Sequence, residues 1–384
     1  MAGKIRVGFV GAGGIVRDRH VPNLKQIDDV ELVCVANRSA ASSQKAAAEL
    51  GIAEAMATWE DLIKRPDLDV VWVGTWPSMH APVTLAALAA GKHVFCQARM
   101  ARYLGEAQEM AAAAAARPKQ MAMLCPPPHF LAVDRRVREL LKGGFCGMIR
   151  HVRVASLGKG LCDPKAPRSW RLSEADSGVQ TLDLGILAEV VHRWVGLPER
   201  VSAEGFIFTP ERPDPAAPGD PTKHLPVTTF EQIAVTCRMA GRGGAIAPQG
   251  PFSVQYSLSG AIAAASPGSI AAIEIYGSKG TIWVEPFSTV VKTATAQRPE
   301  EWLREDLAQS EARREWTVER DFIAAVRSGD GARLEPSFQD GLEYMTLVQR
   351  AVDASKAGRT LSWKDESASY CSVMSKDSGR GTSV

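Results

Sequence analysis

Short apolar runs rich in β-branched residues alternate with alanine-rich stretches over the first 125 residues. The apolar runs predict strands at Ile5–Val10, Val30–Ala36, Val70–Gly74, His93–Cys96 and Met121–Cys125. The alanine-rich stretches predict helices at Ser39–Leu50, Ser78–Ala90 and Gly105–Ala116. Strands and helices that alternate in this way predict a parallel sheet with right-handed crossovers.

The pattern changes after Pro126-Pro127-Pro128, because proline cannot continue the interior of a strand or helix. A helix is predicted at Leu131–Lys142, and one long helix near Asp183–Val195. Further apolar runs predict strands around the long helix, at Ile149–Ser156, Phe230–Met239, Phe252–Leu258, Ala271–Tyr276 and Thr281–Val284. This part of the chain predicts an antiparallel sheet with helices on one face.

Three segments fall outside these elements. Thr209–Pro226, rich in proline, aspartate and glycine, predicts a surface loop, and Arg238–Pro251 predicts a mobile glycine-rich one. The residues from Lys364 onward are polar and predict a tail that is disordered or draped over a partner. We therefore expect two domains, 1–125 and 126–363, followed by a tail at 364–384, in keeping with the length of 384 residues.

Composition argues against several kinds of partner. The 45 basic and 43 acidic residues leave a net charge of +2, so we expect neither nucleic acid nor an anionic membrane as a partner. No apolar stretch reaches the ~18 residues that span a bilayer, and no secretory signal is recognised. The seven cysteines are scattered without a CxxC pair, so no metal site is expected. We expect mostly buried free thiols in a reducing cytoplasm.

A glycine cluster follows the first predicted strand and opens the first helix. Gly11 and Gly13 match the first two glycines of the Rossmann dinucleotide fingerprint, with Gly14 and Ile15 next and Val16 in the third position. The first glycine permits a tight turn, and the second lets a pyrophosphate approach backbone amides at the helix N-terminus. This strand–turn–helix context predicts a domain that binds a nicotinamide dinucleotide.

The end of the second predicted strand indicates which dinucleotide is bound. An NAD site would have Asp or Glu there to accept a hydrogen bond from the ribose 2′-hydroxyl, whereas this chain has Asn37, Arg38 and Ser39. An arginine with small polar neighbours suits a 2′-phosphate, which a carboxylate would repel. We therefore expect NADP(H), with NAD(H) as the alternative if Arg38 instead stacks on the adenine.

Further motifs occur in a fixed order along the chain. They are His20 after the fingerprint, Thr75-Trp76-Pro77-Ser78-Met79-His80, Ala90-Gly91-Lys92-His93-Val94, Trp170-Arg171-Leu172, Asp183-Leu184-Gly185, Ile275-Tyr276-Gly277-Ser278-Lys279-Gly280-Thr281 and a closing helix running to Ala357-Gly358-Arg359. With the glycine turn, they resemble the Gfo/Idh/MocA family of glucose–fructose and inositol dehydrogenase-like oxidoreductases over roughly residues 4–363. The resemblance implies an α/β protein with an N-terminal Rossmann domain and a C-terminal α+β domain. That second domain would have a large, mostly antiparallel open sheet that serves substrate binding and assembly into homodimers or homotetramers.

The resemblance also implies roles for individual residues. Besides the glycine turn and segment 37–39, the expected cofactor-binding residues are Thr75, Trp76, His80 and Gln97. The expected substrate-binding residues are Trp170, Arg171 and Leu187. Trp76 has two open interpretations, packing beside the nicotinamide pocket or ordinary core packing.

The chain departs from the family pattern where the chemistry is expected. Members usually read Glu-Lys-Pro after the strand that ends at Cys96, and the lysine donates to the reacting hydroxyl oxygen; here the lysine position is Ala98. Members also carry Asp and, four residues later, His on the long helix; here Asp183 is present but the histidine position is Leu187. A proline run ending at His129 replaces a segment that is usually polar and contains arginine.

Three residues are candidates for the chemistry. Asp183 would orient or deprotonate a hydroxyl, or else cap its helix. Arg99 would bind an oxyanion or carboxylate, or else stabilise local structure, since its high pKa makes it a poor proton shuttle. His129 would act as acid or base, or else be a structural histidine. Helical spacing places Glu189 and His192 on other faces than Leu187, so neither replaces the missing histidine, and His192 is expected at the surface or an interface.

Three hypotheses about function follow. The first is an NAD(P)-dependent oxidoreductase that moves hydride between the cofactor and a secondary alcohol or ketone of a cyclic substrate, such as a glycoside, polyol or aromatic-derived compound. The second is a redox-neutral lyase, hydrolase or epimerase on the same cofactor-binding scaffold. The third is a non-catalytic dinucleotide-binding protein. Accumulation of NADPH or NADP⁺ during turnover favours the first, turnover without net redox the second, and binding alone the third.

Overall fold

The computed structural model describes residues 3–179, 182–263, 271–332 and 334–364. The first domain contains a six-stranded sheet in the order β3-β2-β1-β4-β5-β6, and every neighbouring pair is parallel. Its strands are β1 (Ile5–Val10), β2 (Val30–Ala36), β3 (Glu54–Ala55), β4 (Val70–Val73), β5 (His93–Cys96) and β6 (Ala122–Leu124). Its helices are η1 (Val16–His20), α1 (Val21–Leu24), α2 (Ala40–Leu50), α3 (Trp59–Ile63), α4 (Pro77–Ala89) and α5 (Leu104–Ala115). The predicted parallel sheet with crossover helices is confirmed.

The strand order reverses between β1 and β4, where connections leave toward opposite sides of the sheet. In open parallel sheets the crevice outside the carboxyl ends of the strands at this point is where ligands bind. The glycine turn follows β1 and Gly74 follows β4, so both lie at this edge. Strand β4 is fully buried, and Trp72 stacks on Phe95 of β5 with ring centroids 3.9 Å apart.

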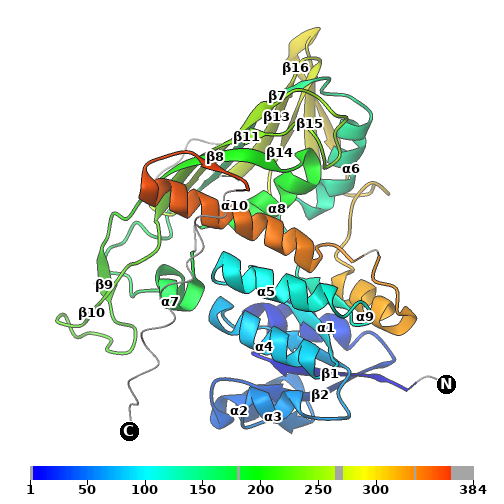
Figure 1. Ribbon diagram of the computed structural model, residues 1–384, viewed down its shortest axis with the longest axis vertical. Helices are drawn as coiled ribbons and strands as arrows, with labels where there is room; N and C mark the ends of the chain where they lie inside the picture. Colours follow the sequence, from blue (N-terminus) through cyan, green and yellow to red (C-terminus); the bar gives the residue numbers. More distant parts are fainter. Residues whose placement is uncertain (1–2, 180–181, 264–270, 333, 365–384) are drawn as a thin grey trace.

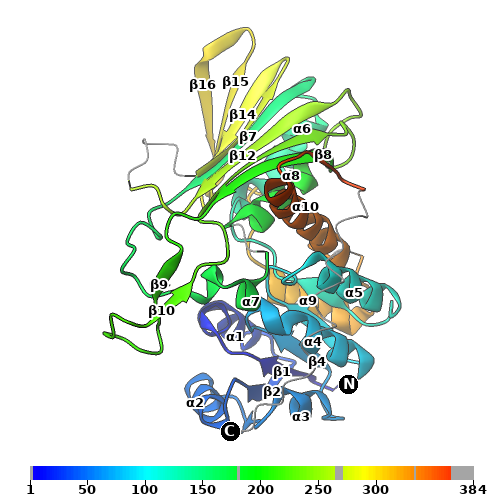
Figure 2. The same cartoon turned by 60° about the vertical axis from the view of Figure 1, so that its left-hand side comes forward.

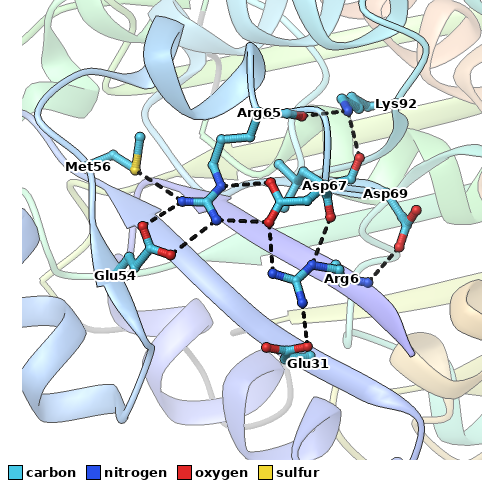
Figure 3. Close-up of polar contacts among 9 residues, drawn as sticks. Arg6, Glu31, Glu54, Met56, Arg65, Asp67, Asp69 and Lys92 are labelled. Carbon is cyan, nitrogen blue, oxygen red and sulfur yellow. Dashed lines mark hydrogen bonds and ion pairs between the residues drawn. The ribbon is translucent and has the colours of Figure 1, made fainter. Parts of the chain in front are cut away.

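The opposite, amino edge of the sheet is tied together by charge. Arg6 pairs with Glu31 at 2.7 Å and with Asp67 at 2.8 Å, which joins the starts of β1 and β2 to the loop before β4. Arg65 pairs with Glu54 at 2.6 Å and with Asp67 at 2.9 Å (Figure 3). These four ion pairs join the starts of β1, β2 and β3 to the loop before β4.

The second domain has a nine-stranded sheet in the order β16-β15-β14-β13-β7-β12-β11-β8-β17. All neighbours are antiparallel except β7 and β12, so a large, mostly antiparallel sheet is confirmed. Its strands are β7 (Ile149–Leu157), β8 (Pro198–Phe206), β11 (Gln232–Met239), β12 (Phe252–Ser259), β13 (Ala271–Gly277), β14 (Gly280–Val284), β15 (Val290–Thr295), β16 (Arg298–Asp306) and β17 (Leu361–Ser362). The helices after residue 126 are α6 (Leu131–Lys142), η2 (Trp170–Leu172), α7 (Glu174–Ser177), α8 (Leu184–Val195), α9 (Val318–Ser328) and α10 (Phe338–Ala357).

Helices α8 and α10 lie between the large sheet and the first domain (Figures 1 and 2). Helix α10 packs against β8 and α8 on one side and against α5 on the other. Helix α9 falls within the range expected for the second domain, but Phe322 packs in the core of the first sheet beside Trp72 and Phe95. The chain therefore returns to the nucleotide-binding sheet after completing the large one.

The expected surface loop at Thr209–Pro226 contains a short two-stranded sheet, β9 (Glu211–Pro213) with β10 (His224–Pro226). It is anchored by a buried ion pair, in which Arg212 donates to Glu231 at 2.7 Å. In Arg238–Pro251, β11 continues to Met239 and residues 240–251 contain no strand. The predicted tail lies outside the described residues from position 365 onward. Within the described ranges, no helix is long and apolar enough to cross a membrane.

Candidate active site

The glycine turn has a geometry that requires glycine. Gly11 has φ +85°, a left-handed conformation that residues with a side chain rarely adopt. A Cβ atom at Gly11 would lie 2.7 Å from Cγ2 of Thr75 and 2.8 Å from the carbonyl carbon of Gly74. Gly13, Gly14 and Ile15 are exposed at the same turn, where a phosphate could approach their backbone. The expected Thr75 thus packs directly against the turn.

The segment after β2 supports this turn and presents one free cation. The amide oxygen of Asn37 accepts a hydrogen bond from the backbone N–H of Ala12 at 2.8 Å. Ser39 is the N-cap of α2, where it forms a capping box with Ser42. Arg38 between them is exposed and forms no ion pair with any described residue. Asn37 and Ser39 therefore shape the backbone, while the guanidinium of Arg38 is available to a ligand.

Two expected cofactor residues have side chains that bind the protein instead. His80 is buried; its Nδ1 lies 2.8 Å from the carbonyl oxygen of Arg99, and its Nε2 lies 3.1 Å from that of Thr75. Burial lowers the pKa of His80, while its contacts with backbone carbonyl oxygens act to raise it. The amide nitrogen of Gln97 lies 2.5 Å from Nε2 of His20, whose Nδ1 is 2.5 Å from Glu319. The polar atoms of His80 and Gln97 therefore contact other residues of the protein, and these contacts hold the loops around the crevice in place.

Trp76 is 42% exposed, which overturns the interpretation of Trp76 as a core residue. Its ring stacks on Trp170 of the second domain, with centroids 5.7 Å apart and an interplanar angle of 14°. The guanidinium carbon of Arg171 lies 4.4 Å from the centroid of the Trp170 ring. The two domains thus meet in a stack of Trp76, Trp170 and Arg171.

Asp183 is the N-cap residue of α8, but its side chain makes no capping hydrogen bond. Its Oδ2 instead accepts a hydrogen bond from the hydroxyl of Ser156, at the end of β7, at 3.0 Å. The carboxylate therefore faces away from the helix it begins, and the capping role is not observed. The other oxygen, Oδ1, has no partner within the described ranges of the chain.

A cavity of about 420 Å³ contains this carboxylate. The candidates His129, Arg171 and Leu187 line it with Asp183, and Phe287 closes one side with its ring 4.3 Å from that of His129. The volume is in the range of small-molecule sites. The structure thus brings together candidate residues from three separate segments of the sequence.

Two basic residues near Asp183, His129 in the cavity wall and Arg99 outside its lining, differ in protonation. Burial lowers the pKa of His129 and Asp183 acts in the opposite direction, so the imidazole is neutral at pH 7. Burial lowers the pKa of Arg99 to about 10, so it stays protonated; Tyr344 and Asp183 act to raise it, and Arg171 to lower it. Arg99 packs against the first turn of α8, where a Cβ on Gly185 would be 3.1 Å from its Cδ. Of these two groups, only His129 can accept a proton near neutral pH.

The opposite face of α8 borders a larger cavity of about 960 Å³. Glu189 and His192 line it, so neither faces the cavity of Asp183, as helical spacing predicts. The expected surface position of His192 is wrong, because His192 is only 7% exposed and Trp363, after β17, packs edge-on against it. Burial lowers the pKa of His192 to about 3 and raises that of Glu189 to about 7.

Some site residues carried no signal in the sequence. Ser156 ends a predicted strand, but its hydrogen bond to Asp183 depends on how β7 and α8 are packed. Phe287 comes from the turn after β14, more than a hundred residues beyond Asp183. Glu319 reaches His20 from α9, 299 residues further along the sequence. The one available signal for this last contact is that a buried histidine needs a polar partner, which an acidic residue can provide.

Comparison with known proteins supports both halves of this site. Residues 5–124 match the model of an oxidoreductase family with an NAD-binding Rossmann fold, and residues 135–283 match the GFO/IDH/MocA C-terminal domain. The chain is 31% identical over 176 residues to 1,5-anhydro-D-fructose reductase of Ensifer adhaerens, covering 45% of this chain and 50% of that protein. It is 32% identical over 209 residues to trans-1,2-dihydrobenzene-1,2-diol dehydrogenase of Bos taurus, covering 52% and 59%.

The matches span about half to three-fifths of the length of these relatives. A solved structure of levoglucosan dehydrogenase in complex with NADH and L-sorbose is similar over 95% of this chain and 100% of that chain, with a TM-score of 0.78. At 19% identity this likeness shows the fold alone. The two family models together span the glycine turn, Trp170, Arg171 and Asp183, and the chain belongs to the Gfo/Idh/MocA family of oxidoreductases.

Proposed function

We propose that this protein is an NADP(H)-dependent oxidoreductase that moves hydride between its cofactor and a secondary alcohol or ketone on a cyclic substrate. The observation that carries the proposal is the carboxylate of Asp183, which lines a cavity and does not cap its own helix. The names of the two relatives support a cyclic substrate, since an anhydrohexose and a dihydrobenzenediol are both ring compounds.

The residues present fit a nicotinamide dinucleotide. The close contact of Gly11 with Thr75 and Gly74 leaves the turn narrow, and the exposed backbone of Gly13 and Gly14 is accessible to a pyrophosphate. The exposed guanidinium of Arg38 favours binding of the 2′-phosphate of NADP(H). The side chains of its neighbours Asn37 and Ser39 already accept hydrogen bonds from backbone N–H groups, whereas Arg38 forms no ion pair with a described residue.

The cavity residues can handle the hydroxyl proton of such a substrate. The bound nicotinamide supplies a hydride acceptor for the carbinol carbon. Oδ1 of Asp183 accepts the hydroxyl proton as the C–O bond becomes a carbonyl, while Ser156 holds Oδ2 in place. Neutral His129 lines the same cavity and can pass this proton onward. In the reverse direction the same groups return the proton to the oxygen.

A turnover assay tests the proposal. The full chain is incubated with NADP⁺ and a panel of cyclic alcohols, including anhydrosugars, cyclic polyols and cyclic trans-diols, and formation of NADPH is followed by absorbance. We expect NADPH to form with at least one cyclic alcohol and the corresponding ketone to appear in equal amount. Binding of NADP(H) without turnover on any alcohol or ketone would overturn the proposal.

One observation favours a second candidate, a redox-neutral lyase, hydrolase or epimerase. Ala98 and Leu187 occupy the two positions where members carry the proton-handling Lys and His, so the hydride route has lost its usual partners. Product formation from a glycoside with no change in the NADPH signal would favour this candidate.

Assembly and compartment complete the proposal. We expect a homodimer or homotetramer through the large sheet, where Trp302 and Leu303 of β16 are 47% and 69% exposed. Light scattering in solution tests this. The six described cysteines are free, which suits the reducing cytoplasm.

A further inference from the structure

The cavity that contains Asp183 also contains a cation that forms no ion pair with a described residue. The guanidinium of Arg171 lines the cavity and lies over the ring of Trp170. It has no hydrogen bond or ion pair to any residue that the structure describes. Some other arginines of the second domain form ion pairs, as Arg153 does with Glu274 and Arg212 with Glu231.

Charged groups are few among the described residues that line the cavity. Asp183 is the one acidic residue among the described residues that line it, and its neighbours include both Arg171 and Arg99. His129 is neutral at pH 7 and adds no charge. The guanidinium of Arg171 therefore keeps its hydrogen-bond donors for a ligand in a partly enclosed space, where electrostatic interactions are stronger than in water.

The rest of the lining suits a ring. Leu187 and Phe287 present apolar surface, and Ser156 and Ser259 contribute two hydroxyl groups. Trp170 lies beneath Arg171 and restricts the directions in which its planar guanidinium can point. A planar fork held in this way is a preorganised partner for a carboxylate, which it binds through two parallel hydrogen bonds.

We propose that the substrate is a small ring compound that carries a carboxylate, which Arg171 binds while the hydroxyl to be oxidised lies at Asp183. This inference rests on the proposed function, since it names the substrate class of the same site. The carboxylate takes no part in the reaction. It anchors the ring so that the carbinol carbon is held at a fixed distance from the cofactor crevice.

Binding of two matched probes tests the inference without turnover. Isothermal titration of the NADP⁺-loaded protein compares benzoate with benzamide, which has nearly the same shape and no charge. We expect benzoate to bind at least tenfold more tightly, with the preference lost in Arg171→Gln and partly kept in Arg171→Lys. Arg168→Gln is the matched control, because Arg168 lies three residues earlier and donates to the carbonyl of Pro226 outside the cavity. Equal binding of the two probes, or an unchanged preference in Arg171→Gln with a melting temperature like that of the unaltered protein, would overturn the inference.

Turnover separates this inference from the proposed function. The substrates are 3-hydroxycyclohexanecarboxylate and its neutral carboxamide, each with NADP⁺. A higher kcat/KM for the acid, lost in Arg171→Gln mainly through KM, supports both claims. Equal or faster turnover of the amide refutes the carboxylate inference and leaves the oxidoreductase intact. A benzoate preference that depends on Arg171, with no NADPH formed from any cyclic alcohol, keeps the anion site and refutes the oxidoreductase.

Discussion

Arg6 and Arg65 at the amino edge of the first sheet differ from Arg38 at its carboxyl edge in how they are partnered. At the amino edge, Arg6 and Arg65 each bind two carboxylates, and Lys92 donates to the carbonyl oxygens of Arg65 and Leu68 at 2.8 and 2.7 Å (Figure 3). At the carboxyl edge, Arg38 has no such partner within the described chain, and neither does Arg171 across the cleft.

This difference indicates which charges stabilise the fold and which await a ligand. A matched ion pair already has its counter-ion, so removing one member affects stability and leaves ligand binding unchanged. An arginine without a counter-ion contributes little to folding, but it gains charge-assisted hydrogen bonds when an anion binds. The same residue type should therefore give opposite phenotypes at the two edges, and substitutions can test this directly.

The largest effect is expected at Asp183, which lines the same cavity as Arg171. Asp183→Asn removes the proton acceptor but keeps the size of the side chain, so turnover should fall by ~10²-fold or more. Melting temperature and NADPH affinity should stay nearly unchanged, because the carboxylate makes no capping bond. Steady-state kinetics and thermal unfolding measure both, with Asp176→Asn in α7 as the control. If turnover survives in Asp183→Asn, His129 becomes the candidate for proton transfer.

The next effect concerns Arg38 and the choice of cofactor. Arg38→Asp exchanges the cation for a carboxylate that repels a 2′-phosphate and accepts from a 2′-hydroxyl, so the order of affinities for NADPH and NADH should reverse. A charge-assisted contact contributes about 1.5–3 kcal/mol, which is roughly a tenfold to hundredfold change in the ratio. Fluorescence titration with both cofactors measures it. Equal affinities in the unaltered protein would contradict the NADP(H) preference.

A gain-of-activity experiment tests how far the residues of the cavity differ from the family pattern. Restoring the usual pair with Ala98→Lys and Leu187→His should create weak activity on free cyclic polyols or aldoses. Leu187 lines the cavity, and Ala98 is exposed, so packing does not block a longer side chain at position 98. Each single change should do little, because residues that act as a unit are not additive. A folded double variant without new activity would indicate wider remodelling of the pocket.

The sequence predicts the framework better than the site. Five of the six strands of the first sheet and the glycine turn can be predicted from local patterns. Buried parallel strands are short apolar runs, and a turn with positive φ requires glycine, so both can be recognised within a few residues. Strand β16 was not predicted because it is exposed along its whole length and has no apolar face. Strands β8 and β15 were also missed.

The site combines residues that only folding brings together. Asp183 was predicted from a motif, but its partner Ser156 and the ring of Phe287 depend on packing between distant segments. Motifs suggest His80 and Gln97 as cofactor-binding residues, yet the direction of their side chains depends on backbone oxygens and on His20. A motif can therefore suggest that a residue lies near the site, but it does not determine which of its atoms face the ligand.

The smallest effect is expected at the amino edge, where Arg65→Gln removes both ion pairs of Arg65. These groups are partly exposed, so each pair is weak, and the melting temperature should fall by roughly 2–4 °C. Pairing with Arg65 lowers the pKa of Asp67 from 3.8 to about 2. A carboxyl with a depressed pKa stabilises the fold above pH 3.8, and this contribution is lost as the pH falls through about 2. The difference in melting temperature between Arg65→Gln and the unaltered protein should therefore shrink in acid, and also at high salt.

NADPH affinity should not change in Arg65→Gln, whereas Arg38→Gln should weaken NADPH binding without lowering the melting temperature. If both substitutions changed stability and affinity alike, the distinction between matched and unmatched arginines would be wrong.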